Sequence, residues 1–452
     1  MSVAPQNLGW LGISRLGLVQ AALGAVVVLA TSTLNRVMVV EWALPALLPG
    51  ILVAVHYLVQ VLRPRMGFGS DLGARRTPWI VGGMGVLATG GLVSAVATAL
   101  MGAFPVPGIA LALVGFVLIG VGVSASGTSL LVLLAKRVAE HRRAAAATTV
   151  WVMMIAGFAI TAGVAGQLLD PFSPARLVAV AAGVSGLAMV VTVLALYGVE
   201  GYPERPAAST ESSAPPPAFR DALRQVWAEP VARQFTIFVF ISMLAYSSQD
   251  LILEPFAGEV FGYTPGESTK LSGLQHGGVL AGMLLMAAAG SLFSGSRWGS
   301  LRHWAVYGCV ASALALLGLA AAGLMGPQWP FKATVFVLGV SNGAFSIAAI
   351  GSMMRLAGEG RASREGVRMG MWGAAQAVAF GLGGLIGTGA SDLARWALGS
   401  PSAAYTAVFA FEAALFLGAA ILAARLGQVA PARPAASPSP VNVAALQQRS
   451  FP

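Results

Sequence analysis

Long apolar runs separated by short polar loops make up most of the chain. Six runs lie in the first half, at about 17–41, 43–62, 79–101, 108–134, 145–167 and 175–198. Six more lie in the second half, near 235–256, 271–292, 304–325, 331–354, 369–389 and 404–426. Each run is close to the ~20 residues that an α-helix needs to cross the hydrocarbon core of a bilayer. The pattern predicts an all-α membrane protein with twelve transmembrane helices.

A hydrophilic segment divides the runs into two groups of six. Residues 200–233 combine acidic residues, several prolines and a Ser/Thr stretch, which is typical of a linker. The tail is rich in Ala, Pro and Ser, which predicts disorder. The predicted organisation is an N-terminal segment at 1–16, a six-helix bundle at 17–199, the linker at 200–233, a second six-helix bundle at 234–426 and the tail at 427–452.

Composition supports a membrane protein. Of the 452 residues, 57% are hydrophobic and 10% are charged, whereas soluble proteins average roughly 45–50% and about 25%. The mean hydropathy is +0.78. So few polar side chains cannot cover a water-facing surface, which excludes a soluble globular protein. The apolar runs are also too long, and alternate too little, for a transmembrane barrel.

Basic residues favour one side of the predicted membrane. Loops after even-numbered helices carry 18 Lys and Arg, and loops after odd-numbered helices carry 4. Because cytoplasmic loops are enriched in Lys and Arg, both termini and the linker are predicted to be cytoplasmic. The net charge of +10 reflects these loops and does not indicate a nucleic-acid partner.

Selected residues recur at a nearly constant spacing in the two halves. His56 and His276 are 220 residues apart, and Trp151 and Trp372 are 221 apart. The first helix of each half also ends in a run of polar residues. These matches predict a duplicated, pseudo-two-fold transporter architecture with six helices in each repeat.

The loop between the second and third runs has a recognisable pattern. Gly67 is followed by Asp71, and then by the basic pair Arg75 and Arg76. The pattern resembles the signature loop of the major facilitator superfamily, although Ala74 replaces its usual glycine. The resemblance implies a gating loop, in which the carboxylate caps a helix and pairs with an arginine to lock one access state. The alternative is an ordinary positively charged cytoplasmic loop.

Charged residues within the apolar runs are functional candidates, because a charge at the bilayer centre costs about 2.5–3.5 kcal/mol on insertion scales. Arg36 and Asp250 lie at matching places on the first and seventh helices, and Glu41 and Glu254 lie closer to the outer interface. We expect Arg36 to pair with Asp250, so that neither charge is bare. Such a pair is either structural, or a gate or polar contact for the substrate.

Two histidines fall within membrane helices. A neutral imidazole there can ligate a metal, relay a proton or hydrogen-bond a neighbouring helix. No second His or Cys lies within a turn of His56 or His276, so we expect no metal site built by the protein alone. One imidazole can still be the axial ligand of a magnesium tetrapyrrole. We prefer His276, because Gly277 and Gly278 beside it leave space for a flat macrocycle; helix packing is the alternative for both.

The residues expected to line a substrate cavity come from helices that surround the central cavity in this superfamily. They are Asn35, Arg36, Glu41, His56, Trp151, Gln249, Asp250, Glu254, Gln275, His276, Trp372 and Gln376. No Gly-x-x-x-x-Gly-Lys-Ser/Thr motif occurs, which argues against an ATP-driven pump.

Longer strings resemble one branch of the superfamily. The residues from Thr33 to Glu41, from Arg75 to Trp79 and from Gln249 to Phe256 resemble the bacteriochlorophyll delivery family, the PucC-like and LhaA-like proteins of purple bacteria. The string from Arg63 to Arg65 places the resemblance closest to the member encoded among bacteriochlorophyll synthesis genes, which has been labelled a synthase chain. The resemblance implies a photosynthetic inner membrane, and bacteriochlorophyll or a precursor as ligand. It also implies antenna polypeptides or pigment-synthesis enzymes as partners.

Three functions stay open at this point. The chain can be a carrier that delivers bacteriochlorophyll for light-harvesting assembly, a secondary transporter of a small apolar solute, or a subunit associated with pigment-synthesis enzymes. Prenyl transfer needs paired aspartates that hold magnesium diphosphate, and no two of the five aspartates lie within a helix turn of each other. We therefore expect no catalytic activity and no intrinsic cofactor. The few polar residues in the bundle predict an apolar cavity, which suits a tetrapyrrole with a phytyl tail.

Overall fold

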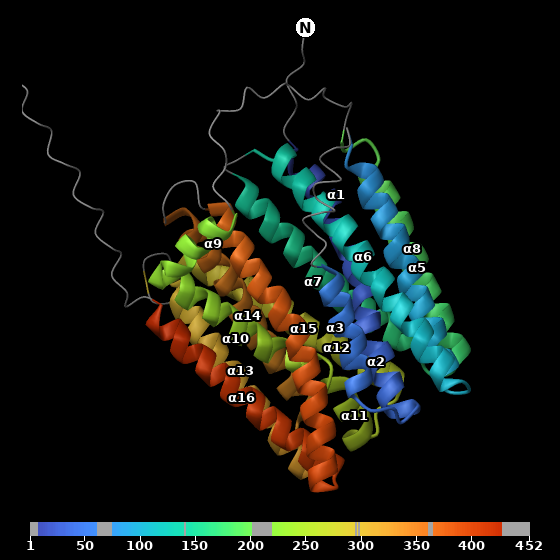
Figure 1. The fold of residues 1–452 in the computed structure, drawn as a ribbon. Helices are drawn as coiled ribbons and strands as arrows, with labels where there is room; N and C mark the ends of the chain where they lie inside the picture. The colour runs from blue at the N-terminus through green and yellow to red at the C-terminus, as the bar shows by residue number, and fades with distance from the viewer. Residues whose placement is uncertain are drawn as a thin grey trace, which may run out of the picture.

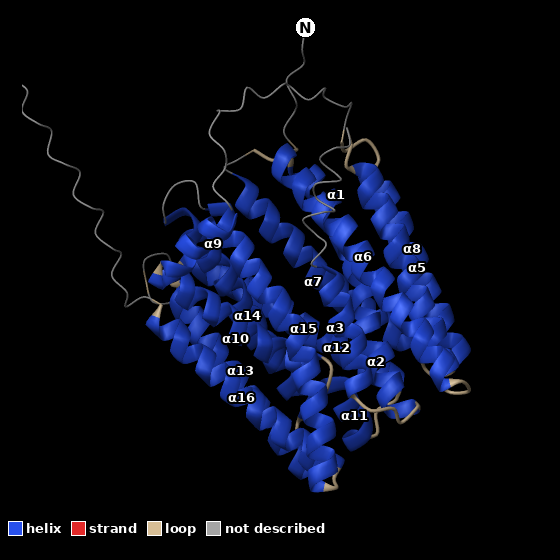
Figure 2. Ribbon diagram, viewed as in Figure 1, coloured by secondary structure: helices blue, strands red, loops and turns tan. Residues whose placement is uncertain are grey.

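The computed structural model describes residues 8–60, 75–139, 142–200, 219–293, 296, 299–359 and 365–426. These residues form helices joined by loops and turns, with no strand among them (Figure 2). Eleven helices in the described part are long and apolar enough to cross a membrane. The all-α fold predicted from the apolar runs is confirmed. The second predicted run is seen as a shorter apolar helix, Leu47–Val59, which ends next to residues outside the described ranges.

The first half begins with a long helix that includes two π-helical turns. Its elements are α1 (Trp10–Val28), η1 (Leu29–Thr33), α2 (Leu34–Arg36), η2 (Val37–Glu41), α3 (Leu47–Val59), α5 (Thr77–Met101), α6 (Pro105–Arg137), α7 (Arg143–Leu168) and α8 (Pro174–Leu196). The π-helical turns η1 and η2 flank Arg36, and such turns are frequent at functional sites.

The second half repeats this plan after an additional short helix. Its elements are α9 (Phe219–Ala228), α10 (Pro230–Asp250), α11 (Leu253–Phe261), α12 (Pro265–Leu292), α13 (Leu301–Met325), η6 (Gly326–Gln328), α14 (Phe331–Glu359), α15 (Glu365–Leu398) and α16 (Pro401–Arg425). Several helices of both halves begin with proline in the first turn, where its missing N–H costs no hydrogen bond. One of them, α12, has a capping box between Thr264 and Glu267.

Each half has its own apolar core. Leu16, Leu87 and Phe116 belong to the core of the first half, and Phe256 and Phe409 belong to that of the second. In Figure 1 the blue and green helices of the first half stand beside the yellow, orange and red helices of the second. The two groups of helices correspond to the two repeats that the sequence spacing predicted.

The halves touch closely at one end of the bundle, where η1, α2, η2 and α11 lie together (Figure 1). The starts of α3 and α12 lie at the same end, and we call it the closed end. Glycines allow the close approach: a Cβ on Gly273 of α12 would lie 3.2 Å from the Cα of Gly163 in α7. Small residues of this kind let membrane helices pack backbone against backbone.

Candidate substrate cavity

A cavity of about 340 Å³ lies between the two halves. Its wall comes from α1, η1, α3, α6 and α7 on one side, and from α10, α11, α12, α14 and α15 on the other. Most of the wall is apolar, with residues such as Leu23, Val27, Ile155, Phe158 and Met243. A largely apolar pocket with a few convergent polar groups is the usual form of a site for a small organic ligand.

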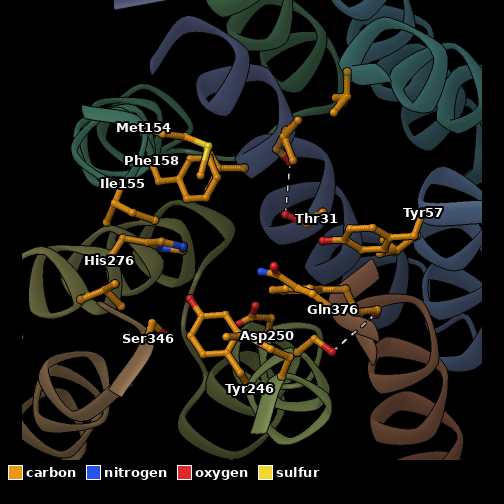
Figure 3. Close-up of a pocket in the computed structure, with 18 of the residues that line it drawn as sticks. Thr31, Tyr57, Met154, Ile155, Phe158, Tyr246, Asp250, His276, Ser346 and Gln376 are labelled. Carbon is orange, nitrogen blue, oxygen red and sulfur yellow. Dashed lines mark hydrogen bonds between the residues drawn. The ribbon is translucent and has the colours of Figure 1, made fainter. Parts of the chain in front are cut away.

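His276 of α12 points into this cavity. Its Nδ1 lies 2.9 Å from the carbonyl oxygen of Ser272, one turn earlier in the helix. A carbonyl can only accept, so Nδ1 carries the proton and Nε2 has a free lone pair. The ring of Phe158 in α7 meets the imidazole edge-on, with centroids 5.1 Å apart. Figure 3 shows the imidazole beside Phe158 at the cavity wall. His276 is thus held in the orientation and tautomer of a metal-ligating histidine.

His56 of α3 lies in a different environment. Its Nε2 is 2.9 Å from the amide nitrogen of Gln60, so the ring nitrogen accepts this hydrogen bond. The imidazole is 2% exposed and lies against Tyr57, with ring centroids 4.9 Å apart. The lone pair that a metal would need is already used. The preference for His276 over His56 therefore rests on hydrogen bonding.

The two glycines beside His276 do not shape the cavity as predicted. Gly278 faces α14, where a Cβ would lie 2.5 Å from the carbonyl oxygen of Phe336. Gly277 has open space around it, but neither glycine is part of the cavity wall. Consecutive helical residues differ in direction by about 100°, so residues next to His276 point elsewhere. Gly373 of α15, which does line the cavity, opens space for a ligand instead.

Polar groups gather opposite the apolar wall. Figure 3 shows Tyr246, Asp250 and Gln376 turned toward the same space as His276. Tyr246 and Asp250 are one turn apart on α10, and Gln376 comes from α15. These groups supply one carboxyl, one hydroxyl and one amide to an otherwise apolar cavity. They can orient a ligand that has a few polar substituents.

Arg36 does not pair with Asp250, so this prediction is wrong. The Arg36 guanidinium instead binds the carboxylate of Glu41 and the carbonyl oxygen of Tyr263. The sequence positions of Arg36 and Asp250 predicted how far along its helix each residue lies, but not the direction in which each side chain points around the helix axis. Arg36 is 2% exposed and is not part of the cavity wall, whereas Asp250 lines it.

The predicted cavity residues divide into two groups. Those in the cavity wall are His56, Trp151, Asp250, Glu254, Gln275, His276 and Gln376. Those elsewhere are Asn35, Arg36, Glu41, Gln249 and Trp372. Asn35 donates to the carbonyl oxygen of Leu251, 2.5 Å away, and Trp372 packs in the core of the second half against Phe235. The functional role of the lining residues stays a prediction.

Several hydrogen bonds and an ion pair between the two halves lie at the closed end. Ser32 donates to the Glu254 carboxylate, and Thr33 lies 3.0 Å from Thr269, hydroxyl to hydroxyl. Two aspartates at equivalent places, Asp170 and Asp392, bind the start of the other half's second helix. The Asp170 carboxylate accepts from the Thr264 hydroxyl at 2.8 Å and from the Lys270 ammonium group at 3.2 Å. The Asp392 carboxylate accepts from the backbone nitrogens of Ala46 at 3.1 Å and Leu47 at 2.7 Å.

The predicted gating loop lies largely outside the described residues, which include neither Gly67 nor Asp71. Arg75 is exposed, and the backbone nitrogen of Arg76 donates to the Glu200 carboxylate. The same carboxylate accepts from the backbone nitrogen of Thr77 at 2.7 Å and from its hydroxyl at 2.6 Å. Glu200 therefore caps the start of α5, a role that its place in a linker did not reveal.

Comparison with known proteins identifies the family. The family model described as PUCC protein matches residues 33–430. The chain belongs to this family. It is 53% identical over 420 residues to the "Bacteriochlorophyll synthase 44.5 kDa chain" of Rhodobacter capsulatus, covering 92% of this chain and 95% of that one. It is 31% identical over 442 residues to "Protein PucC" of the same species, with 94% of both chains covered. The family resemblance seen in the sequence strings is confirmed.

Solved structures with the same fold are transporters of the major facilitator type. A peptide transporter, POT, in complex with sulfate superposes with a TM-score of 0.67 at 14% identity, covering 94% of this chain and 96% of that one. The nucleoside transporter NupG superposes with a TM-score of 0.63 at 14% identity, covering 93% and 100%. At this identity the likeness shows the fold alone. The protein is a multi-pass membrane protein with a transporter-like fold that belongs to a photosynthesis-associated family.

Proposed function

We propose that the protein is a carrier and assembly factor that binds bacteriochlorophyll or a precursor inside the membrane. In this proposal it delivers the pigment to light-harvesting antenna polypeptides or to pigment-synthesis enzymes. It acts in the bacterial photosynthetic inner membrane with both termini in the cytoplasm, as the distribution of basic residues predicts. It has no catalytic step and no resident cofactor, and the pigment is its cargo.

The observation that carries the proposal is the orientation of His276. The carbonyl oxygen of Ser272 accepts from Nδ1, which leaves Nε2 free at the wall of an apolar cavity. A magnesium tetrapyrrole needs one axial donor, and a neutral imidazole nitrogen is suitable. Apolar residues of both halves line the same cavity and can cover the macrocycle and its tail. A relative whose name refers to bacteriochlorophyll supplies the pigment class.

A second candidate is a transporter of a small apolar solute. The fold supports this candidate, because the protein superposes on solved structures of a nucleoside transporter and a peptide transporter. The polar groups of Asp250 and Gln376 would then contact the solute. The His276 geometry favours pigment, since a small solute does not require an oriented, unprotonated ring nitrogen.

Co-purification tests the proposal. The protein is produced in a bacterium that makes bacteriochlorophyll and is purified in mild detergent, and the absorption spectrum of the eluted peak is recorded. We expect a bacteriochlorophyll band, shifted from its position in detergent alone, in fixed ratio to protein. Protein that elutes without pigment, yet binds a small solute, would support the second candidate.

A matched pair of variants makes this test specific to the cavity. Gly373 and Gly82 are both helical glycines with open space around them, but only Gly373 lines the cavity. Gly373→Phe should fill the cavity and remove the pigment, whereas Gly82→Phe should retain it. Equal pigment in both variants would place the pigment outside the cavity and contradict the proposal.

A further inference from the structure

A buried acid in the second half has no role in the pigment site. Glu412 lies in the middle of α16, a largely apolar helix, and is 0% exposed. Within the described part of the chain, both of its carboxyl oxygens lack a hydrogen-bond partner. An ionised carboxylate without a partner in an apolar interior is too costly to persist, so the group must bind a proton or a cation.

Asp250 is the acidic neighbour of Glu412. Asp250 lies on α10 and Glu412 on α16, and these two helices pack against each other, so charges on both carboxyl groups would repel across the contact. Asp250 lines the cavity, whereas Glu412 lies behind it. Neither carboxyl has an ion pair among the described residues. Two interacting carboxyl groups in a low dielectric cannot both be ionised, so at least one holds a proton.

Several other titratable groups on the helices around α16 are engaged elsewhere. On α11, Glu254 accepts from Ser32, and Glu259 pairs with Arg395 of α15 at 2.7 Å. On α13, Arg302 donates to the carbonyl oxygen of Ala424, near the last turn of α16 and away from Glu412. The remaining titratable side chains that the structure describes on these helices are His303, Tyr307 and Cys309 on α13, Arg368 and Asp392 on α15, Arg233, Tyr246 and Asp250 on α10, and Tyr405 and Arg425 on α16 itself; Tyr246 lies one turn from Asp250.

We propose that Asp250 and Glu412 form a proton-binding pair inside the membrane, and that its proton exchanges with cavity water through Asp250. Glu412 is the inner member and holds a proton, because cavity water does not reach it. Asp250 is the outer member and titrates against that water. A ligand that fills the cavity displaces this water, so ligand binding and the protonation of Asp250 are linked. The pair itself exists whether or not the ligand is a pigment.

Infrared spectroscopy of the purified full-length protein in lipid bilayers, without added ligand, tests the pair directly. A protonated carboxyl group has a carbonyl stretch separate from the amide bands, and this stretch shifts when the proton is replaced by deuterium. We expect such a band at neutral pH in the wild type. It should be lost in Glu412→Gln and should be displaced in Glu412→Asp. The second variant retains a carboxyl group and serves if the first does not accumulate.

The role of Asp250 is tested by exchange. In Asp250→Asn the Glu412 band should remain, but it should shift more slowly after transfer to heavy water, because the route to the cavity is interrupted. Glu259→Gln, which removes a carboxylate paired with arginine, is the control and should leave both the band and its exchange unchanged. A band that persists in Glu412→Gln would overturn the proposal. Unchanged exchange in Asp250→Asn would also overturn it.

Discussion

Asp170 and Asp392 make equivalent contacts in the two halves, whereas His56 and His276 make different ones. The aspartates are 222 residues apart and the histidines 220 apart, so both pairs fit the same internal repeat. Each aspartate binds the start of the other half's second helix at the closed end. Of the histidines, one has its Nε2 occupied by Gln60 and the other has it free. The halves are therefore symmetric at these contacts between them, and asymmetric in the wall of the candidate cavity.

This difference has a physical reason. Two halves that move against each other around a central site need equivalent contacts on each side. A ligand without two-fold symmetry needs different groups from the two halves. Repeats that once carried the same residue can thus retain it and still use it differently, because the neighbouring side chain decides which ring nitrogen is available.

The largest effect should come from the histidines. His276→Gly removes the proposed axial donor, and we expect bound pigment to fall by about 10-fold or more, the scale on which metal sites respond to ligand changes. His56→Gly should leave most of the pigment bound. Pigment extracted per purified protein is the measurement. A larger loss in His56→Gly than in His276→Gly would reverse the assignment.

The next effect concerns the closed end. Arg36 pairs with Glu41 and does not contact Asp250, so Arg36→Ala and Glu41→Ala should be non-additive in stability. A coupling of about 1–3 kcal/mol is expected for residues in direct contact. Arg36→Ala and Asp250→Ala should be additive. Thermal stability in detergent across both double-mutant cycles is the measurement, and coupling only in the second cycle would contradict the structure.

A smaller effect should test the symmetric aspartates. Asp170→Asn and Asp392→Asn each weaken hydrogen bonds to the start of a helix, and such caps contribute about 1 kcal/mol. We expect both variants to destabilise the closed end by similar amounts and to increase the accessibility of Thr33→Cys to a thiol reagent. Arg176→Gln is the control, because Arg176 lies in the first turn of α8 near Asp170 and its hydrogen bonds are to Ser173 and Pro171 of its own half. Opposite effects of the two aspartate variants would contradict their equivalence.

The smallest effect should come from Phe158. Its ring meets the His276 imidazole edge-on, an arrangement that contributes about 0.5–1.5 kcal/mol. Phe158→Leu should weaken pigment binding a few-fold while the ligand nitrogen remains. Ile155→Leu, at a lining position on the same helix, is the control. Pigment binding in Phe158→Leu that equals the loss in His276→Gly would mean that packing, and not the imidazole, determines binding.

The sequence predicted those features that depend on position along a helix. Apolar runs gave the helices, and the resemblance to the superfamily, whose cavity is lined by the second and eighth helices among others, led to the expectation that both histidines line the cavity, where both lie. The sequence did not predict the direction in which a side chain points around its helix axis. Trp372 occupies the position in the second repeat that Trp151 occupies in the first, yet Trp372 packs in a core beside Phe235. The sequence could not predict this, because a helical periodicity of 3.6 does not distinguish a face in the core from a face in the cavity.

Some signals were present in the sequence and were missed. Glu412 is a lone acid within an apolar run, and such a residue is a functional candidate by position alone. Other features were not accessible from sequence. The π-helical turns on either side of Arg36 change the direction of its side chain, and no residue pattern around Val37–Glu41 marks them. Glu200 caps a helix that is more than a hundred residues earlier in the chain.

Chemical rescue tests the central claim most directly, namely that the His276 imidazole holds the magnesium of a pigment in the cavity. The measurement is the bacteriochlorophyll absorption spectrum of purified His276→Gly, with and without added imidazole. We predict little bound pigment without imidazole, and recovery of the wild-type spectrum when imidazole enters the space left by the side chain. Unchanged pigment content and an unchanged spectrum in the His276→Gly, His56→Gly double variant would show that neither histidine coordinates magnesium, and would contradict the account.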